Sequence, residues 1–390
     1  MNYILFDGDV RTSLLPFTFT RPVADIRVGI TTLREKWEVF LKAETSSLTE
    51  DYLQEKFPLV LKSDNVFING SLVSTKQLAD CIQQLEVNQK LVDANQLIIA
   101  YRATENLSDL SNFDTISFSE NIIQIKNTWD IFEKNDEVLR QDFASLSQNR
   151  QSQPIPKTVQ TLGEENIFIE DGAKMNFVTL NASTGPIYIG KNAEIMEGSV
   201  IRGPFALCEE AVVKLSAKLY GATTIGPHCK VGGEVSNSVI FGYSNKGHDG
   251  FLGNSVLGEW CNIGADSNNS NLKNNYEEVK LWSYETENFA KTGLQFCGLM
   301  MGDHSKCGIN TMFNTGTVVG VSANIFGSGF PRNFVPSFSW GGAAGFTTYL
   351  TKKAFEVAKV VMSRRKVDFT AVDQRLLEKV FELSSKWRKD

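Results

Sequence analysis

The sequence predicts a two-part protein in which an α/β domain is followed by a parallel β-helix with helices at its end. Three observations carry this prediction. Apolar runs alternate with amphipathic patterns over residues 1–143, aliphatic residues recur at every sixth position from Ile189, and two amphipathic segments follow residue 345. The length of 390 residues also exceeds that of one ordinary hydrophobic core, which favours more than one domain.

The N-terminal region contains short apolar runs that we interpret as buried strands, at residues 3–6, 59–61, 66–68 and 97–100. Residues 31–41 and 73–85 instead have the spacing of amphipathic helices. Such alternation favours an α/β layer fold with a mostly parallel sheet over residues 1–143. Residues 144–160 are rich in Ser, Gln and Pro and lack periodicity, which indicates a linker.

The strongest pattern in the chain is a period of six. The positions in this series are all aliphatic: Ile189, Ile195, Ile201, Leu207, Val213, Leu219, Ile225 and Val231. The residues four positions later are mostly small, such as Ala193, Ser199 and Ala211. A period of six fits neither an α-helix nor a simple strand, and it is typical of the hexapeptide repeats of a parallel β-helix. We therefore predict a β-helix over residues 161–335.

The period is interrupted twice. After Val231 its phase shifts by two residues and resumes at Phe251, and residues 265–299 look like an excursion from the coil before the period returns at Met301. Residues 347–366 then have an amphipathic helical pattern. A second helix is expected to start at Thr370, with Asp373 as its capping-box partner. These two helices make up a predicted helical segment at 345–390.

Composition excludes several classes of function. The net charge of -6 leaves no electrostatic footprint for nucleic acid or an anionic membrane surface. The six cysteines form no C-x-x-C pair, so reduced thiols are the simplest interpretation. The apolar start of the chain meets Asp7 and Asp9 at once, as in a first strand rather than a signal peptide, and no run of residues is long enough to span a bilayer. We expect a cytoplasmic protein without nucleic-acid or membrane partners.

One histidine stands out in the stretch "NKGHDGFLGN". His248, one of three histidines in the chain, lies among glycines at the point where the period slips. A break in register is a place where a β-helix can turn a side chain away from its regular face, so His248 is a candidate proton acceptor. A solvated loop histidine is the alternative. His228 and His304 are expected to have structural or surface roles.

Four segments carry a family resemblance: "GPFALCEEAVV" (203–213), "NKGHDGFLGN" (245–254), "EWCNIGAD" (259–266) and "NNYEEVK" (274–280). In this order they resemble the acetyltransferase half of the bifunctional UDP-N-acetylglucosamine pyrophosphorylase / glucosamine-1-phosphate N-acetyltransferase family. The resemblance implies a left-handed β-helix, a homotrimer, and acetyl-CoA-dependent N-acetylation of an aminosugar 1-phosphate.

The same resemblance assigns roles to individual residues. It makes His248 the general base and implies substrate-binding positions at Phe251, Asn262, Asn275, Tyr276 and Lys280. Phe251 stands where the family has a tyrosine. Cys208 and Ser236 stand where the resemblance leads us to expect an arginine and a lysine.

The N-terminal domain is similar to sugar-1-phosphate nucleotidyltransferases through "LFDGDVRTSLLPFTFTRPV" (5–23). The backbone N–H groups of such a loop can cradle phosphates. The resemblance implies nucleotide binding at Gly8, Arg11 and Arg21, with Val23 in place of the family lysine and Asn69 in place of an acidic metal ligand. It leaves a Mg²⁺ requirement open, and the metal ligands are unknown.

Three functions follow from these patterns. The first is a sugar-phosphate-modifying enzyme that acetylates an aminosugar 1-phosphate and whose N-terminal domain also transfers nucleotides. The second is a nucleotidyltransferase whose β-helix serves only as a trimer scaffold. The third is a non-catalytic trimer that binds a sugar nucleotide. The first two share the same small-molecule partners, a sugar phosphate and a nucleotide.

Overall fold

The computed structural model describes residues 1–107 and 109–388. The chain forms two compact units, each made of several segments. Unit 1 contains Met1–Leu14, Thr20–Ile26 and Thr31–Asn127, and unit 2 contains Leu15–Phe19, Arg27–Ile30 and the chain from Thr128 onward. Helices α3 (Asp130–Glu133) and α4 (Asn135–Ser147) therefore group with the β-helix, although they lie largely before the linker predicted at 144–160.

Unit 1 is an α/β unit built on one six-stranded sheet. The strands in spatial order are β2 (Thr45–Leu48), β1 (Asn2–Phe6), β3 (Asn65–Asn69), β5 (Ile98–Ala103), β4 (Gln89–Val92) and β6 (Asp114–Ser117). Helices α1 (Leu33–Leu41) and α2 (Lys76–Gln83) bury their apolar faces with these strands in one core. A capping box at Thr32 and Glu35 starts α1, because both side chains satisfy backbone N–H groups of the first turn.

The predicted α/β class is confirmed, with two differences. The sheet is mixed rather than mostly parallel, since β3–β5 and β4–β5 are antiparallel while the other three pairs are parallel. The strand predicted at 59–61 is wrong: Val60 and Leu61 are 45% and 49% exposed and belong to no strand. A run of three apolar residues after Pro58 is too short to distinguish a strand from an irregular edge segment.

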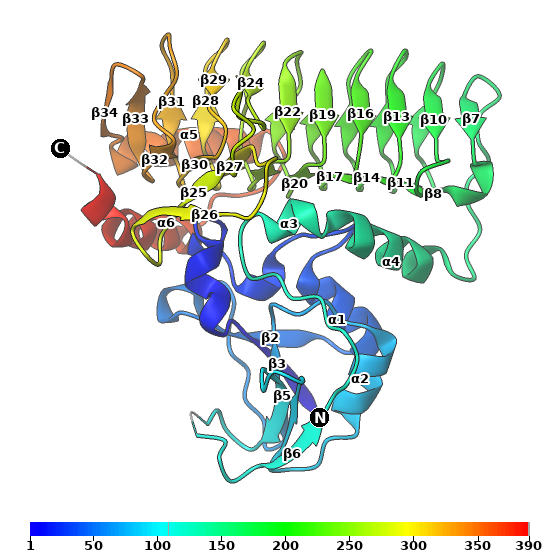
Figure 1. Ribbon diagram of the computed structural model, residues 1–390, viewed down its shortest axis with the longest axis vertical. Helices are drawn as coiled ribbons and strands as arrows, with labels where there is room; N and C mark the ends of the chain where they lie inside the picture. The colour runs from blue at the N-terminus through cyan, green and yellow to red at the C-terminus, as the bar shows by residue number, and fades with distance from the viewer. Residues whose placement is uncertain (108, 389–390) are drawn as a thin grey trace. The chain divides into compact units, whose positions relative to one another are not determined.

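Unit 2 is dominated by a parallel β-helix whose three sides we number in chain order (Figure 1). The first side contains β7 (Gln160–Leu162), β10 (Thr179–Asn181), β13 (Val200–Arg202), β16 (Lys218–Tyr220), β19 (Glu234–Ser236) and β22 (Phe251–Gly253), followed by the pair β24 (Asn268–Asn269) and β29 (Met312–Phe313). The second side contains β8 (Ile167–Ile169), β11 (Ile187–Ile189), β14 (Phe205–Leu207), β17 (Thr223–Ile225), β20 (Val239–Ile240), β23 (Val256–Leu257), β27 (Leu299–Met301), β30 (Thr317–Val319) and β32 (Phe334–Val335).

The third side contains β9 (Lys174–Met175), β12 (Glu194–Ile195), β15 (Val212–Val213), β18 (Lys230–Val231) and β21 (Asn245–Lys246). It continues with β28 (Lys306–Cys307), β31 (Asn324–Ile325), β33 (Ser339–Gly342) and β34 (Gly345–Thr348). The residues of the six-residue series point inward and form one continuous core, from Ile167 to Val335. The predicted left-handed β-helix is thus confirmed as the fold class of this part of the chain.

The corner between the second and third sides holds a row of non-glycine residues in the left-handed backbone region. The row consists of Asn192, Glu210, His228, Tyr243, Trp260, His304, Ser322 and Phe338, with φ between 54° and 61°. Such a backbone conformation is uncommon outside glycine and asparagine. Its recurrence on every coil shows that the tight corner itself demands it.

The coil is interrupted where the sequence predicts an excursion. After β24 the chain leaves the coil, forms the antiparallel hairpin β25 (Lys280–Ser283) and β26 (Asn288–Lys291), and returns at β27. Helices α5 (Thr351–Ser363) and α6 (Ala371–Leu383) follow the last coil, and Thr370 and Asp373 form the predicted capping box. The predicted segment 345–390 ends in residues 389–390, which lie outside the described residues. None of the described helices has the length and apolar character needed to cross a membrane.

The outer surface of the second side is covered within unit 2. Ile30 and Leu139 pack on Phe168, Tyr188 and Cys208 in one buried cluster. Asp142 accepts a hydrogen bond from the backbone N–H of Ile30 at 2.7 Å, and the Cys208 thiol donates to the carbonyl of Ile30 at 3.4 Å. Cys208 therefore lies under the segment Arg27–Ile30, which explains why a basic side chain is absent there.

Candidate functional site

The phase slip seen in the sequence is produced by three shortened sides. Successive inward-facing residues are Val231, Val235, Ile240, Lys246, Leu252, Leu257 and Ile263, so the steps between them are four, five, six, six, five and six residues. The inward residue of β22 is consequently Leu252, whereas Phe251 faces outward and is half-buried. The shortest step, from Val231 to Val235, turns its corner with only Gly232, Gly233 and Glu234.

Lys246 occupies an inward-facing position that is aliphatic on the preceding coils. It pairs with Val231 in the register of the third side, and only 2% of its surface is exposed. Its ammonium group donates to the carbonyl of Gly232 at 3.0 Å and to the carbonyl of His248 at 2.6 Å. Burial lowers the pKa of Lys246 to about 8, although the carboxylates of Asp249 and Asp266 act in the opposite direction. The buried ammonium thus ties the short corner to the next one.

The turn Gly247–Gly250, which we call the His248 turn, lies directly above the short corner. A Cβ on Gly233 would lie 2.8 Å from the Cα of Asp249 and 2.8 Å from the carbonyl oxygen of His248, so only glycine fits there. His248 is exposed, and among the described residues its imidazole has no hydrogen bond, ion pair or ring contact. Its backbone is fixed by Lys246 while its ring stays available to solvent.

Asparagine side chains connect the His248 turn to the outer face of the third side. Asn245 Nδ2 donates to Asn262 Oδ1 at 3.1 Å, and Asn245 Oδ1 lies 3.4 Å from the position that a Cβ of Gly247 would take. On successive coils of the third side, Lys230 pairs with Asn245, Asn245 with Asn262, and Asn262 with Lys306. The structure therefore places the predicted Asn262 beside Asn245, which stands three positions before the predicted base, and no contact joins Asn262 to the His248 imidazole among the described residues.

The other predicted substrate residues lie elsewhere. The ring of Phe251 covers Gly253 on the first side, and its backbone N–H donates to Asn268 Oδ1 at 2.8 Å. Asn275, Tyr276 and Lys280 are exposed on the excursion, and Tyr276 has a φ of 57°. Within the part of the chain that the structure describes, no hydrogen bond, ion pair or ring contact joins these three to the His248 turn. Their roles stay predictions.

The two other histidines belong to a stack along the corner between the second and third sides. The ring centroids of His228 and Tyr243 are 4.7 Å apart, those of Tyr243 and Trp260 are 4.2 Å apart, and His304 continues the stack at 6.2 Å from Trp260. Parallel rings on successive coils stabilise the corner. Their geometry agrees with the structural roles expected for His228 and His304.

In unit 1 the residues assigned to nucleotide binding lie in one loop, where Arg11 is held by neighbouring side chains. Arg11 donates to Asp7 Oδ2 at 3.0 Å and to the hydroxyl of Tyr52 at 2.9 Å, and its Nε lies 3.4 Å from Glu50. Burial raises the pKa of Tyr52 to about 12 and also raises the pKa of Asp7, against the effect of Arg11. The predicted phosphate ligand is therefore part of a partly buried ion pair.

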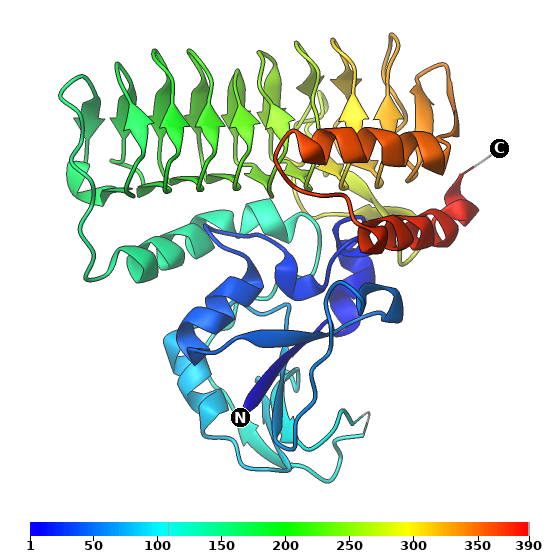
Figure 2. The ribbon, with the colours of Figure 1, turned by 180° about the vertical axis from the view of Figure 1, so that it is seen from behind.

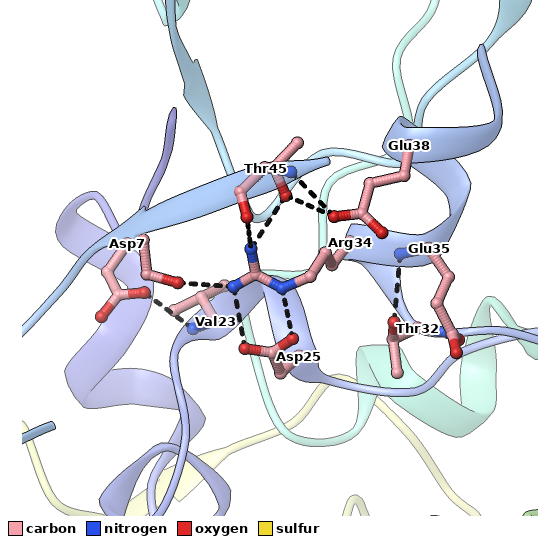
Figure 3. Close-up of polar contacts among 9 residues, drawn as sticks. Asp7, Val23, Asp25, Thr32, Arg34, Glu35, Glu38 and Thr45 are labelled. Atoms are coloured by element: carbon pink, nitrogen blue, oxygen red, sulfur yellow. Dashed lines mark hydrogen bonds and ion pairs between the residues drawn. The ribbon is translucent and has the colours of Figure 1, made fainter. Parts of the chain in front are cut away.

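A second ion pair flanks the same loop. Figure 3 shows Arg34 beside Asp25 and Thr45: its Nε donates to Asp25 Oδ1 at 2.6 Å, and its Nη1 donates to Thr45 Oγ1 at 2.8 Å. Although burial acts in the opposite direction, the hydrogen bond and charge of Asp25 raise the pKa of Arg34, and the charge of Asp7 adds to this effect. No pattern in the sequence had indicated this role for Arg34.

The remaining loop residues are arranged for packing. Gly8 has a φ of 63°, and Arg21 is buried with 4% exposure. Asn69 accepts from the hydroxyl of Ser71 at 2.7 Å and donates to the carbonyl of Ile98 at 3.3 Å, so its amide is already engaged. Among the described residues, no three His, Cys, Asp or Glu side chains are grouped to hold a metal ion. Mg²⁺ at nucleotide sites is usually held by one or two carboxylates together with the substrate phosphates, so a Mg²⁺ requirement of unit 1 stays a prediction.

Comparison with known proteins finds a family for the N-terminal part of the chain and several relatives. Residues 3–151 match the sugar nucleotidyl transferase family. An uncharacterized acetyltransferase, YaiX of Escherichia coli, is 26% identical over 158 residues, which are 40% of this chain and 66% of that protein. The bifunctional protein GlmU of Trichodesmium erythraeum is 32% identical over 108 residues, 27% of this chain and 22% of that protein.

A bifunctional sugar-1-phosphate nucleotidylyltransferase/acetyltransferase of Sulfurisphaera tokodaii is 28% identical over 160 residues, 40% of this chain and 37% of that protein. Among solved structures, a hexapeptide transferase family protein from Anaplasma phagocytophilum covers 59% of this chain and 93% of its own, at 16% identity and a TM-score of 0.23. The chain spans no more than about two thirds of the length of these curated relatives.

An α/β unit of the nucleotidyltransferase type joined to a hexapeptide β-helix defines a two-part architecture of the transferase class. Within that class, bifunctional GlmU and sugar-1-phosphate nucleotidylyltransferase/acetyltransferase proteins are among the relatives that the chain resembles.

Because the ammonium of Lys246 is buried, we expect the free energy of unfolding to depend on pH through this group. The folded protein releases its Lys246 proton near pH 8 and the unfolded chain near pH 10.5, so the unfolded chain binds more protons between these values. The contribution of Lys246 to the free energy of unfolding therefore rises as the pH increases through this window. We expect this free energy, for the natural protein minus the Lys246→Met variant, to grow by ~2 kcal/mol from about pH 7 to about pH 9.5.

Urea titrations of both proteins at the two pH values measure this difference, and the comparison cancels other groups, including Lys306, whose pKa burial also lowers to about 8. A difference that is constant with pH would show that Lys246 is not a desolvated ammonium in the folded protein.

Proposed function

We propose that the protein transfers the acetyl group of acetyl-CoA to the amine of an aminosugar 1-phosphate and that His248 is the general base. The observation that carries this proposal is the His248 turn. Its backbone is pinned from inside the β-helix by Lys246, while its imidazole is exposed and, within the described residues, unpartnered. A fixed backbone with a free imidazole suits proton transfer to a bound substrate.

The reaction needs a neutral nitrogen nucleophile, because an ammonium has no lone pair. In the proposal His248 accepts one proton from the sugar ammonium, and the nitrogen then forms a bond to the thioester carbon. The carbon–sulfur bond breaks, and the second proton of the nitrogen leaves with the thiol. The amides of Asn245 and Asn262 lie on the same face and can donate to carbonyl oxygens of either substrate.

The residues on this face fit an acetyl-CoA-type donor, whose arm carries amide groups that match the Asn245–Asn262 pair. Phe251, Asn275, Tyr276 and Lys280 complete the substrate-binding set of the proposal. Because the last three lie on the excursion, they can serve the His248 turn of a neighbouring copy, which agrees with the proposed homotrimer. A cytoplasmic location is part of the same proposal.

Nucleotidyl transfer in unit 1 is the second activity we propose. The family match over residues 3–151 favours it. For catalysis Arg11 would have to exchange Asp7 for a nucleotide phosphate, while Gly8 offers its backbone N–H and Arg21 stays buried in support of the loop. The partners of this activity are a nucleotide and a sugar 1-phosphate.

Ligand-induced stabilisation tests the two activities separately. At a concentration of ~100 times Kd, a ligand adds about 2.7 kcal/mol to the free energy of unfolding, which is a shift in Tm of a few degrees. We expect shifts with acetyl-CoA and with glucosamine 1-phosphate, together with release of free thiol when both are present. UTP and dTTP test unit 1. Stabilisation by a nucleotide with no response to acetyl-CoA and no thiol release would contradict the acetylation proposal.

A further inference from the structure

Four basic side chains gather beside the His248 turn, and we call them the cationic cluster: Lys214, Lys230, Arg364 and Arg365. Lys230 faces outward on β18, and Lys214 follows β15 on the preceding coil, where its backbone N–H donates to Val231 at 2.7 Å. Arg364 and Arg365 follow α5. Figure 2 shows α5, in orange, lying along the β-helix with its C-terminal end toward the middle coils.

The charges of these residues act on one another. Besides burial, the charges of Arg365, Lys214 and Arg364 lower the pKa of Lys230, and that of Arg365 acts more strongly than that of Lys214 on the neighbouring coil. The C-terminal end of α5 therefore brings its two guanidinium groups to the same face as the two lysines. The side chains of Lys214, Lys230 and Arg365 are half-buried, so three of the four charges in the cluster are partly shielded from solvent.

The cluster has no anionic partner in the described chain. None of its four side chains forms an ion pair or a side-chain hydrogen bond among the residues that the structure describes. The one carboxylate that raises the pKa of Lys230 belongs to Glu194, two strands away on the third side. Strands are spaced by about 4.8 Å, so Glu194 lies roughly 10 Å from Lys230 along the sheet. Four cations at short range without a counter-ion repel one another, and a bound anion would relieve that repulsion.

The cluster borders the proposed catalytic turn. The Cβ of Lys214 lies 3.1 Å from the position that a Cβ of Gly232 would take. The carbonyl of Gly232 accepts a hydrogen bond from the Lys246 ammonium, which also donates to the carbonyl of His248. Lys230 pairs in register with Asn245, which donates to Asn262 and stands three positions before His248. A ligand group bound at the cluster would thus be part of a molecule that also reaches His248.

We propose that the cationic cluster binds a phosphate group of a substrate that reacts at His248, an inference that rests on the proposed function. A phosphate monoester carries roughly two negative charges and accepts bidentate hydrogen bonds from guanidinium groups. The cluster supplies the basic groups that are missing at Cys208, which Arg27–Ile30 covers, and at Ser236, which is 7% exposed. The phosphate belongs either to the aminosugar 1-phosphate or to the acyl donor.

The test compares ligand binding by two variants of α5, one without the two basic side chains that follow its C-terminal end and one without two basic side chains in its first turn. The variant Arg364→Ala/Arg365→Ala is matched by Lys352→Ala/Lys353→Ala, which changes exposed residues in the first turn of the same helix. We expect the first variant to raise the Kd of its phosphate ligand about 10- to 100-fold and to flatten the salt dependence of binding, with kcat little changed. The control should leave Kd within about twofold.

Two pairs of probes distinguish the sources of the phosphate. Glucosamine 1-phosphate against glucosamine isolates the sugar phosphate, and acetyl-CoA against an acetylated short thiol without phosphates isolates the donor phosphate. Weakening confined to the phosphorylated member of either pair supports the proposal and names the source. Unchanged Kd values for both phosphorylated probes would overturn it, as would a change in oligomeric mass with unchanged binding, which would show that the cluster pairs with an acidic surface of another copy.

Calorimetric binding keeps this test independent of turnover. Suppose that the natural protein binds a phosphorylated probe, the variant does not, and the natural protein releases no thiol. The proposed acetylation would then be wrong, while phosphate binding by the cluster would be supported. If the natural protein acetylates the amine and the variant binds the phosphorylated probes as tightly, the phosphate-binding proposal is wrong and the acetylation proposal is supported. The variant Lys214→Gln, at a half-buried position of the coil, repeats the measurement should loss of both arginines reduce the Tm.

Discussion

Replacement of His248 by alanine is expected to lower the rate of amine acetylation by about 10²- to 10⁴-fold, the usual contribution of a general base. The Michaelis constants should change little, because the exposed imidazole makes no contact in the described protein and serves only to take the proton. The Tm should also stay nearly constant, since the His248 turn is held through the backbone carbonyl of His248 rather than through its ring. A steady-state assay of thiol release with glucosamine 1-phosphate measures the effect.

The matched control for this prediction is His228→Ala. His228 is a half-buried histidine on a different corner, where its ring stacks on Tyr243. Loss of that stack should cost about 1 kcal/mol of stability and leave the acetylation rate unchanged. Equal rates in the natural protein and the His248 variant, with both folded, would remove His248 from the mechanism.

Replacement of Gly226 by alanine is expected to destabilise unit 2 by more than about 3 kcal/mol. The added Cβ would lie 1.5 Å from the carbonyl oxygen of Phe241 and 2.5 Å from that of Ile240, both backbone atoms of the next coil. The backbone N–H of Gly226 donates to that same Ile240 carbonyl at 2.8 Å, so separating the coils also breaks a hydrogen bond. Urea unfolding followed by tryptophan fluorescence measures the loss.

Gly242→Ala is the control, because Gly242 lies in the corner of the coil that Gly226 touches. The nearest atom to its added Cβ is Glu259 Oε1 at 3.5 Å, which is ordinary van der Waals contact. We expect its free energy of unfolding to stay within about 0.5 kcal/mol of the natural protein. If Gly226→Ala were as stable as Gly242→Ala, the close stacking of these coils would be wrong.

The β-helix could be predicted in detail because each inward residue contacts the one above it, so a single repeating requirement is written directly into the sequence. The slip near His248 was visible, but its cause was not. The steps of four and five residues around Val235 and Ile240 spread one shift over three sides, and counting in sixes placed Phe251 inward instead of Leu252. Lys246 was missed for the same reason, since a lysine in an aliphatic series looks like an outward residue.

The nucleotide-binding loop shows a different limit. Gly8, Arg11 and Arg21 were found from a local motif, and the structure does place them in one loop. A motif does not state what its basic groups contact, however, and Arg11 pairs with Asp7 and Glu50 while Arg21 is buried. The sheet order was equally hidden, because strands of similar composition pair in parallel or antiparallel fashion according to contacts far apart in the chain.

By itself, the sequence determined the period of the β-helix, the place of its excursion, the two C-terminal helices and the one histidine at the slip. These features depend on spacing along the chain, which the sequence states directly. Only the tertiary structure decided that Lys246 holds the His248 turn from within and that Arg364 and Arg365 come to the side of Lys230. The second relation joins residues up to 135 positions apart (Lys230 to Arg365), and folding alone brings such residues within range of each other's charge.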